Sequence, residues 1–466
     1  MPKILLGYTL EHSRWVFQPT AWRLALRNLS RNIRRNMATG SALALGFAGL
    51  LALMGFLYSI DSYLAAYTVY GTQIGHLTVF KSQGFERYAM EPKAYSFSPA
   101  DQQVIRSTLA RHPEIELSSG QLQGSGLISN GCDTQPFQAR GTDPDTAQAL
   151  RQHKELRRWN VPMQSYVRGQ SAADLPLDLN PIQLSNTLAK QLNKQKLYSE
   201  FDQHDNLAVV PDCTALAKHQ LDSNVQLLTK SWADAMSIQD AEVVGVFSGK
   251  AEGQKSALTM ALPQLQKLLD TEHVSSYGLW LKDPSRAPAL AKTLAQELRS
   301  AGLNVDIYSW TSKQTNPLYA GTMNFLRIMI TFLACVLVAI VVFSIFNAST
   351  MTAIERSQET GMMRSLGFER QALTSLFGME ILLLSLISIA LGGVIGFIGI
   401  EGVQALKIRL YPPGLEGGME LILRPGFKAS FLTAVGLVIL TTLTALAVQR
   451  KIAQQRIINL LSAANR

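Results

Sequence analysis

The chain has 466 residues, of which 47% are hydrophobic, and it carries a formal net charge of +9 at pH 7. The excess lies at the two ends: seven basic residues and one acid precede residue 37, and four basic residues without an acid follow residue 448. Basic residues that flank apolar segments stay on the cytoplasmic side of a membrane. The charge therefore indicates membrane orientation, and it requires no nucleic-acid partner.

Apolar segments near the roughly 20 residues that a bilayer core requires occur at four places, residues 37–60, 325–348, 377–400 and 431–448. The first lacks the short apolar core and small-residue cleavage site of a signal peptide, so we interpret it as a retained anchor. The predicted fold class is an α-helical membrane bundle of four transmembrane helices with a large mixed α+β extracytoplasmic domain between the first and second spans.

With four spans, both termini are expected in the cytoplasm of a bacterial cell, and the chain is expected in its inner membrane as a multi-pass protein. The predicted order is a cytoplasmic N-terminal segment (1–36), the first span (37–60), a periplasmic domain (61–324), the second span (325–348), a cytoplasmic loop (349–376), the third span (377–400), a short periplasmic loop (401–430), the fourth span (431–448) and a cytoplasmic tail (449–466). The N-terminal segment has apolar residues at helical spacing and arginines on another face, a pattern typical of an interfacial helix and also compatible with a basic flank.

Small residues recur at intervals of four within two of the spans. The first span carries Ala44, Ala48 and Ala52, and the third carries Gly392 and Gly396. Small side chains at this spacing let helix backbones approach closely. They predict helix packing and carry no information about a substrate.

The large polar domain shows both strand and helix patterns. β-rich runs lie at Ile74–Phe80, Ala241–Phe247, Tyr277–Leu281 and Asn304–Tyr308, and helical periodicity lies at Pro99–Leu109 and Arg286–Ser300. A capping box at Ser98 is expected to begin the first helix, and Gly302 to end the second. The order strand, helix, strand from Tyr277 to Tyr308 predicts an α/β subdomain beside the second span.

No catalytic, cofactor or metal-binding constellation is recognised in this domain. Its histidines lie apart, and we interpret His76 as a packed strand residue and not as a ligand. The stretch from Gly245 to Ala251 lacks the spacing and the magnesium-binding hydroxyl of a phosphate-binding loop. Cys132 and Cys213 permit one disulfide in an oxidising compartment, and their spacing leaves the pairing open.

The stretch from Met351 to Gly367 is charged and rich in methionine. A short charged helix with exposed methionines on a membrane face favours docking of a soluble partner. A solvated loop accounts for the charges but poorly for the methionines.

Two stretches resemble a known family: the basic run from Arg23 to Arg35, and the run from Glu355 to Gly367. They are similar to the two signature stretches of the FtsX/MacB/lipoprotein-releasing permeases of ABC transporters, which share this four-span topology. The resemblance implies that the second stretch is a coupling helix in a groove of the ATPase. The residues at its patterned places, with Met362 of its methionine cluster, are Glu355, Arg356, Glu359, Gly361, Met362, Arg364 and Gly367. Thr360 departs from the usual small aliphatic residue, and Glu380 matches an acid that would be costly to bury unpaired.

The resemblance also implies a non-enzymatic permease subunit that binds no cofactor itself. A separate dimer of ATPase subunits would use ATP and magnesium, and a second permease, a copy or a paralogue, would complete the membrane dimer. The preferred cargo is a lipoprotein or another amphiphile taken from the inner-membrane lipids and passed to a periplasmic carrier. Its cavity would be lined by Phe56, Leu57, Phe325 and Ile328. Two alternatives are a MacB-like efflux component and an FtsX-like regulator of cell-wall hydrolases.

Overall fold

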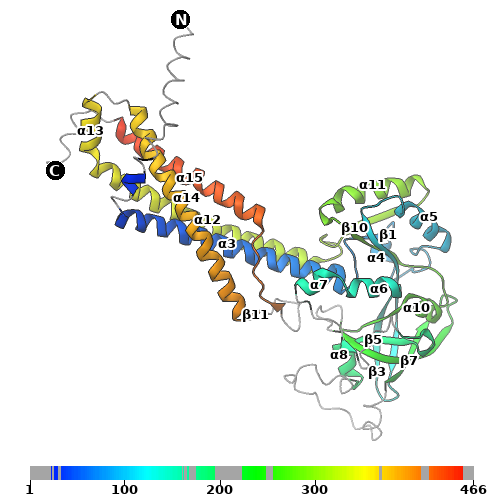
Figure 1. Ribbon diagram of the computed structural model, residues 1–466. Coiled ribbons are helices and arrows are strands. Elements are labelled where there is room, and N and C mark those ends of the chain that lie inside the picture. The colour runs from blue at the N-terminus through cyan, green and yellow to red at the C-terminus, as the bar shows by residue number, and fades with distance from the viewer. Residues whose placement is uncertain are drawn as a thin grey trace. The chain divides into compact units, whose positions relative to one another are not determined.

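The computed structural model describes residues 23, 26–29, 33–159, 161, 165–166, 175–194, 223–247, 255–366, 370–410 and 419–454. The chain divides into two compact units (Figure 1). The helical unit comprises Met1–Ile60, Asn324–Ile408 and Leu421–Arg466, and the α/β unit comprises Asp61–Met323 and Arg409–Glu420.

Four helices among the described residues are long and apolar enough to cross a membrane. They are α3 (Ile33–Ala65), α12 (Pro317–Glu355), α14 (Arg370–Ala405) and α15 (Phe427–Ala453). The predicted fold class is confirmed, because the mixed α/β unit lies in the chain between the first and second of these helices. The short helix α13 (Ser357–Ser365) follows α12 after one residue.

The small-residue faces predicted to allow close helix packing in the first and third spans pack against each other. A Cβ added to Gly392 of α14 would lie 2.5 Å from the carbonyl oxygen of Ala44, and one added to Gly396 would lie 3.4 Å from Cα of Ala48. On another side of α3, a Cβ at Gly46 would lie 2.4 Å from the side chain of Val341 in α12. Helix α3 thus supplies much of the apolar core that the four helices share.

Ten strands form one sheet in the described part of the α/β unit. They are β1 (Leu77–Lys81), β2 (Ile115–Ser129), β3 (Thr134–Thr142), β4 (Ser165–Tyr166), β5 (Pro181–Ser185), β6 (Asn224–Lys230), β7 (Met236–Phe247), β8 (Ala257–Ala261), β9 (Ser276–Leu281) and β10 (Val305–Ser309). A separate two-stranded ladder joins β11 (Arg409–Leu410) and β12 (Met419–Glu420). The helical segments of the unit are η1 (Ala66–Gly71), α4 (Gly84–Arg87), α5 (Pro99–Leu109), α6 (Pro144–Arg151), α7 (Lys154–Arg158), η3 (Leu177–Leu179), α8 (Asn186–Gln191), α10 (Leu262–Leu269), η6 (Pro284–Arg286) and α11 (Ala287–Ser300).

Part of the sheet closes into a ring of strands. The order β2, β3, β8, β5, β7 continues through β6, which pairs with both β7 and β2. Alternate residues of these strands, among them Leu122, Phe137 and Leu258, point into one apolar core with α8 and α10. Closure removes the free edges that an open sheet of these strands would expose.

Strands β1, β9 and β10 form the predicted α/β subdomain, whereas the short β4 pairs with β7 of the ring. Strand β1 lies between β9 and β10 and pairs antiparallel with both, while α5 and α11 pack on the same core. The capping box at Ser98 is confirmed, because the Ser98 hydroxyl accepts a hydrogen bond from the amide of Asp101 and the Asp101 carboxylate accepts one from the amide of Ser98. Gly302, with a φ of +88°, follows α11 in the left-handed conformation that favours glycine.

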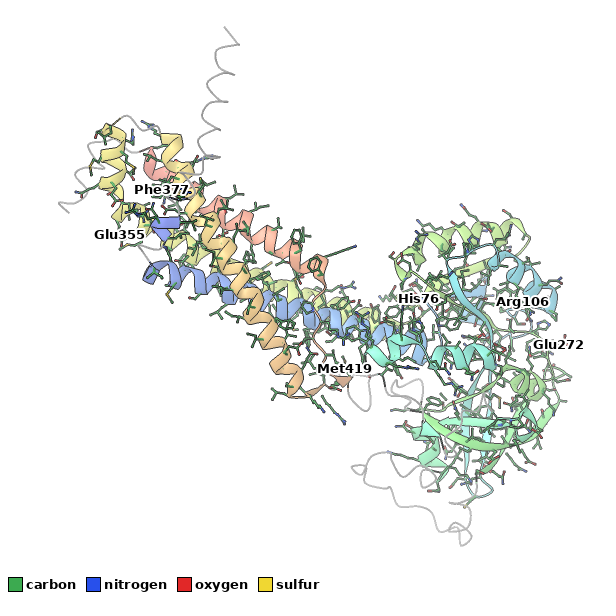
Figure 2. The ribbon with its side chains drawn as sticks, viewed as in Figure 1. His76, Arg106, Glu272, Glu355, Phe377 and Met419 are labelled. Atoms are coloured by element: carbon green, nitrogen blue, oxygen red, sulfur yellow. The ribbon has the colours of Figure 1, made fainter. Side chains whose placement is uncertain are left out.

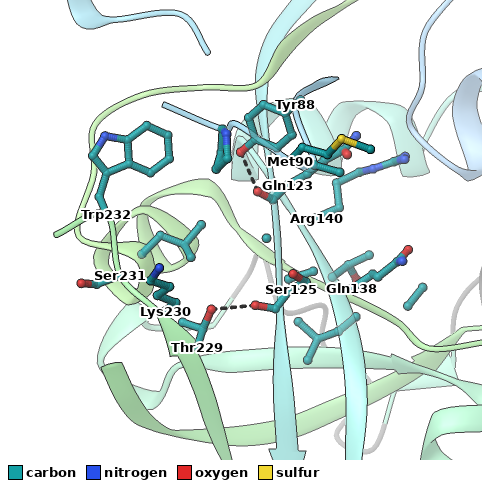
Figure 3. Close-up of a pocket in the computed structure, with 18 of the residues that line it drawn as sticks. Tyr88, Met90, Gln123, Ser125, Gln138, Arg140, Thr229, Lys230, Ser231 and Trp232 are labelled. Carbon is teal, nitrogen blue, oxygen red and sulfur yellow. Dashed lines mark hydrogen bonds between the residues drawn. The ribbon is translucent and has the colours of Figure 1, made fainter. Parts of the chain in front are cut away.

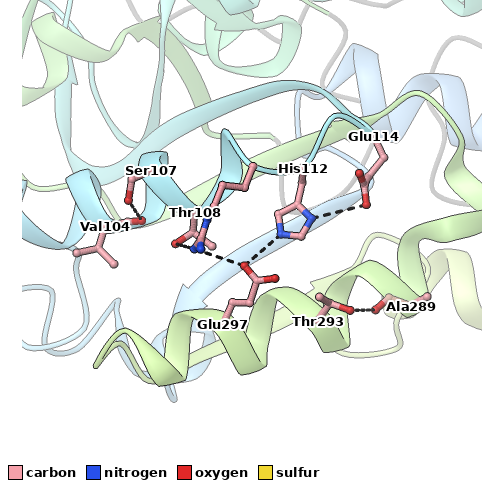
Figure 4. Close-up of polar contacts among 9 residues, drawn as sticks. Val104, Ser107, Thr108, His112, Glu114, Ala289, Thr293 and Glu297 are labelled. Carbon is pink, nitrogen blue, oxygen red and sulfur yellow. Dashed lines mark hydrogen bonds and ion pairs between the residues drawn. The ribbon is translucent and has the colours of Figure 1, made fainter.

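Polar contacts link the end of α5 to α11 (Figure 4). Nε2 of His112 lies 3.3 Å from the carboxylate of Glu297 in α11, and Nδ1 of His112 lies 3.7 Å from that of Glu114. Arg111 also approaches Glu297, at 3.5 Å. These contacts hold the two helices together at the rim of their shared apolar core.

Candidate functional site

The candidate docking element is α13, and a break in the helix separates it from α12. Arg356 has φ −95° and ψ 14°, which ends α12 at Glu355 and starts α13 at Ser357. Glu355 and Glu359 therefore belong to different helices, although their spacing in the sequence indicates one continuous helix. The methionines of the predicted stretch are shared between the same two helices.

One face of α13 is buried and the opposite face is exposed. Ser357, Thr360 and Gly361 form the buried face, at positions one turn apart. The departure at Thr360 is accommodated, because its hydroxyl donates a 2.9 Å hydrogen bond to the carbonyl of Arg356. A threonine here satisfies its own polar group inside the helix and remains compatible with burial.

The exposed face of α13 carries both charge and apolar surface. Glu359 is exposed, Met362 has 56% of its surface exposed, and Leu366, just beyond the helix, has 75%. Apolar side chains this open are common at surfaces that bind a partner, especially when acidic or basic groups surround them. Arg364 is half-buried, and Gly367 lies outside the described residues.

The anchor of this helix is an ion pair between Arg356 and Glu380 of α14. Nη1 of Arg356 donates to both carboxylate oxygens of Glu380 at 3.2 Å, and the two side chains are only 13% and 10% exposed. The guanidinium also lies over the ring of Phe377, with 5.9 Å from Cζ to the ring centroid. Figure 2 shows Phe377 and Glu355 at the end of the bundle that carries α13.

A third segment joins the same carboxylate. The side-chain amide of Asn28, from the predicted N-terminal interfacial helix, donates a hydrogen bond to Glu380. Its neighbours among the described residues, 26–29, are helical, and the amide of Asn36 donates to the carbonyl of Leu29 at 2.9 Å. Glu380 therefore ties together the N-terminal segment, the α12–α13 break and the third span.

The structure assigns different places to the predicted coupling residues. Arg356 is a buried anchor whose guanidinium is occupied within the chain, whereas Glu355, Glu359 and Met362 are exposed. Sequence reasoning grouped them because they are neighbours in one motif. The sequence indicates only that Glu380 would be costly to bury unpaired, and the structure supplies Arg356 as its partner.

The four predicted cargo residues lie on two helices of the bundle. Phe56 and Leu57 of α3 are half-buried, while Phe325 and Ile328 of α12 are 65% and 63% exposed. Helix α12 exposes many further apolar side chains. In its most apolar stretch of 18 residues, only 17% is buried inside the structure. In a membrane this face must contact lipid or another polypeptide.

Only one of the two cysteines of the predicted disulfide lies among the described residues. Cys132 takes part in a disulfide bond, Cys335 in α12 is free, and Cys213 lies outside the described residues. Pairing of Cys132 with Cys213 therefore stays a prediction.

His76 is a packed residue beside β1, as its sequence context predicts. It is 3% exposed, its Nδ1 accepts a 3.0 Å hydrogen bond from the amide of Leu281, and its ring meets Tyr70 edge-on. His153 stacks on the other side of Tyr70. Burial, and then the neighbouring His153, lower the pKa of His76 from 6.5 to about 4.

Among the described residues no group of three or more His, Cys, Asp or Glu side chains is placed to hold a metal ion.

The buried His76 makes stability depend on pH. Between pH 6.5 and 4 the unfolded chain binds a proton at this histidine that the folded chain excludes. The contribution of His76 to the free energy of unfolding is therefore fully present above pH 6.5 and falls as the pH decreases towards 4. We expect a loss of about 3 kcal/mol from this residue by pH 4. His76→Asn is expected to flatten this part of the curve of unfolding free energy against pH, measured in denaturant titrations. An unchanged slope in His76→Asn would contradict the buried neutral imidazole.

Comparisons with known proteins add the following. Residues 331–457 match the family model described as FtsX-like permease C-terminal. The periplasmic region of MacB from Actinobacillus actinomycetemcomitans is similar at 13% identity and a TM-score of 0.30, covering 50% of this chain and 87% of that one. The extracellular domain of the ABC-type transporter YknZ from Gram-positive bacteria is similar at 13% identity and a TM-score of 0.29, covering 50% and 98%. No curated protein gives a significant match.

Proposed function

We propose that this chain is the permease subunit of an ABC transporter whose helix α13 docks a separate ATPase, since residues 331–457 match the family model described as FtsX-like permease C-terminal. The observation that supports this most is the construction of α13. Its exposed face holds Glu359 and Met362, while the buried Arg356–Glu380 pair fixes its base. A docking helix must transmit force, so its base must be rigid and its outer face free.

The proposed mechanism needs no chemistry from this chain. Closure of two ATPase subunits on ATP and magnesium would push α13, and Arg356 would pass the displacement through Glu380 to α14. Asn28 on the same carboxylate would involve the N-terminal segment. We place both termini and α13 in the cytoplasm of the cell and the α/β unit in the periplasm, because the basic residues cluster before α3 and after α15.

The exposed face of α12 supports a membrane dimer. Among the described residues Phe325 and Ile328 are 65% and 63% exposed, and such a face on a span must contact either lipid or another helix. We propose that a second permease, either a copy or a paralogue, faces α12. The two α12 helices and the outer halves of the two α3 helices would then border a cavity open to the lipid.

A lipoprotein or a similar amphiphile is the cargo that we propose for this cavity. Exposing an acyl chain to water costs about 0.8 kcal/mol per methylene, so extraction requires an apolar path and a receiving carrier. Half-buried Phe56 and exposed Ile328 are suited to line such a path. Efflux and control of cell-wall hydrolases remain the alternatives, in which cargo or partner meets the α/β unit instead.

A photo-crosslinker at Ile328 tests the cargo proposal in membranes that also contain the ATPase. We expect it to capture an acylated protein without ATP and to lose that product when ATP is added. The matched control is Ile330 on the same helix, which is 6% exposed and should capture none. Capture of phospholipid or permease alone at Ile328, with a soluble partner captured from the α/β unit, would favour the alternatives.

A further inference from the structure

A cavity of about 860 Å³ lies within the α/β unit (Figure 3). Its floor is the outer face of β2, β3 and β8, and its two rims are the loop 88–94 and the turn between β6 and β7. Hydrogen bonds brace these walls: the Tyr88 hydroxyl donates to the carbonyl of Gln123 at 2.8 Å, and that of Thr229 to the carbonyl of Ser125 at 2.6 Å. Cavities of this size are typical of small-molecule sites.

Arg140 on the floor is a cation with no acidic partner in the described part of the chain. The strand register aligns it with Gln123 on β2 and with Thr259 on β8. Its Nη1 donates a 2.9 Å hydrogen bond to the carbonyl of Thr72, and no carboxylate among the described residues pairs with it. The protein surroundings desolvate the guanidinium enough to lower its pKa below the usual range. A desolvated charge of this kind favours an anion as its counterpart.

The acids that line the cavity are engaged elsewhere or lie at its opening. Asp234 accepts from Lys93 at 2.8 Å and from Lys230 at 2.9 Å, so this cluster has a surplus of positive charge and joins the two rims. Glu91 is on the exposed loop. The interior of the cavity is therefore electropositive on balance.

Apolar surface completes the lining. The lining also includes Tyr67, Trp232, Phe247 and Leu269, of which Leu269 is already buried in the apolar core. A site for a free inorganic anion would have no need of this surface, whereas a ligand with an apolar chain would bury it there. Charge and apolar walls together describe a molecule with an anionic head and an acyl chain.

We propose that this cavity binds an anionic amphiphile, with the carboxylate or phosphate of its head at Arg140 and its chain against the apolar walls. The inference goes beyond the proposed function, because the site lies within the α/β unit and binding there requires neither ATP nor an ATPase.

The test uses the full chain in lipid nanodiscs with a photoreactive palmitic acid and its uncharged methyl ester as probes. We expect the acid to label peptides of the cavity about tenfold more than the ester, the ratio typical of one hydrogen bond to a charged group. Arg140→Gln should reduce labelling by the acid to the level of the ester. The control Arg299→Gln, at an exposed arginine of α11 outside the lining, should leave it unchanged.

A second variant keeps the test decisive if Arg140→Gln unfolds. Ser125→Phe fills the cavity from the floor and retains the backbone carbonyl that Thr229 contacts, so both probes should lose cavity labelling. Labelling that persists in Ser125→Phe would overturn the site, and equal labelling by acid and ester would overturn the anionic head. If inorganic phosphate alone abolishes labelling at the concentration of the acid, the cavity is a free-anion site and the amphiphile proposal is wrong.

Discussion

Replacing Arg356 with alanine is expected to lower the free energy of unfolding of the helical unit by about 3–5 kcal/mol, because it leaves the buried carboxylate of Glu380 without its cation. The amide of Asn28 also donates a hydrogen bond to that carboxylate. Helix α13 would also lose the anchor at its first turn. We therefore expect both a lower unfolding temperature of the purified full chain and weak retention of the ATPase.

Matched variants separate charge burial from general damage. Arg370→Ala removes an exposed arginine at the start of α14 and should change neither property. Replacing both Arg356 and Glu380 with methionine should recover most of the stability, since a buried ion pair is often replaceable by apolar residues of similar volume. If Arg356→Ala has the same unfolding temperature as Arg370→Ala, the ion pair does not anchor the helix.

Reversing the charge of Glu359 is expected to weaken binding of the ATPase by at least about tenfold without unfolding the permease. Glu359 is exposed on α13, so the isolated chain should tolerate Glu359→Lys. At an interface, a charge that faces its like typically costs several kcal/mol. Co-purification of the ATPase and its stimulation by the permease should fall together.

Glu401→Lys is the control for this experiment. It makes the same change at an exposed position near the other end of α14, and should leave ATPase binding intact. Equal losses in the two variants would point to a general effect of charge, and no loss in either would move the docking surface away from α13.

Patterns that are local in the chain predict much of the helical unit. Runs of apolar residues indicate the four spans, and small residues every four positions indicate faces for close helix packing. The structure pairs two of these faces, at Ala44 of α3 and Gly392 of α14. The capping box at Ser98 is equally local, since its two partners lie three residues apart. Such features depend on residues that are close in the sequence, so they can be predicted without knowledge of the fold.

Features that depend on distant contacts were not predictable. The helix break at Arg356 has no proline or glycine to indicate it, and the guanidinium at the break pairs with Glu380, which lies more than twenty residues away in α14. The closed ring of strands requires β6 to pair with β2, which precedes it by about a hundred residues. The cavity around Arg140 draws its walls from segments between Tyr67 and Leu269, so no motif could show it.

A photo-crosslinker introduced at Met362, and separately at Thr360, tests the central claim most directly. Both residues lie on α13, but Met362 is 56% exposed and Thr360 is 5% exposed. In membranes that contain the permease and its ATPase, we predict a crosslink to the ATPase from Met362 and none from Thr360. An ATPase that co-purifies with the permease but crosslinks from neither position, or only from Thr360, would contradict docking on the exposed face of α13.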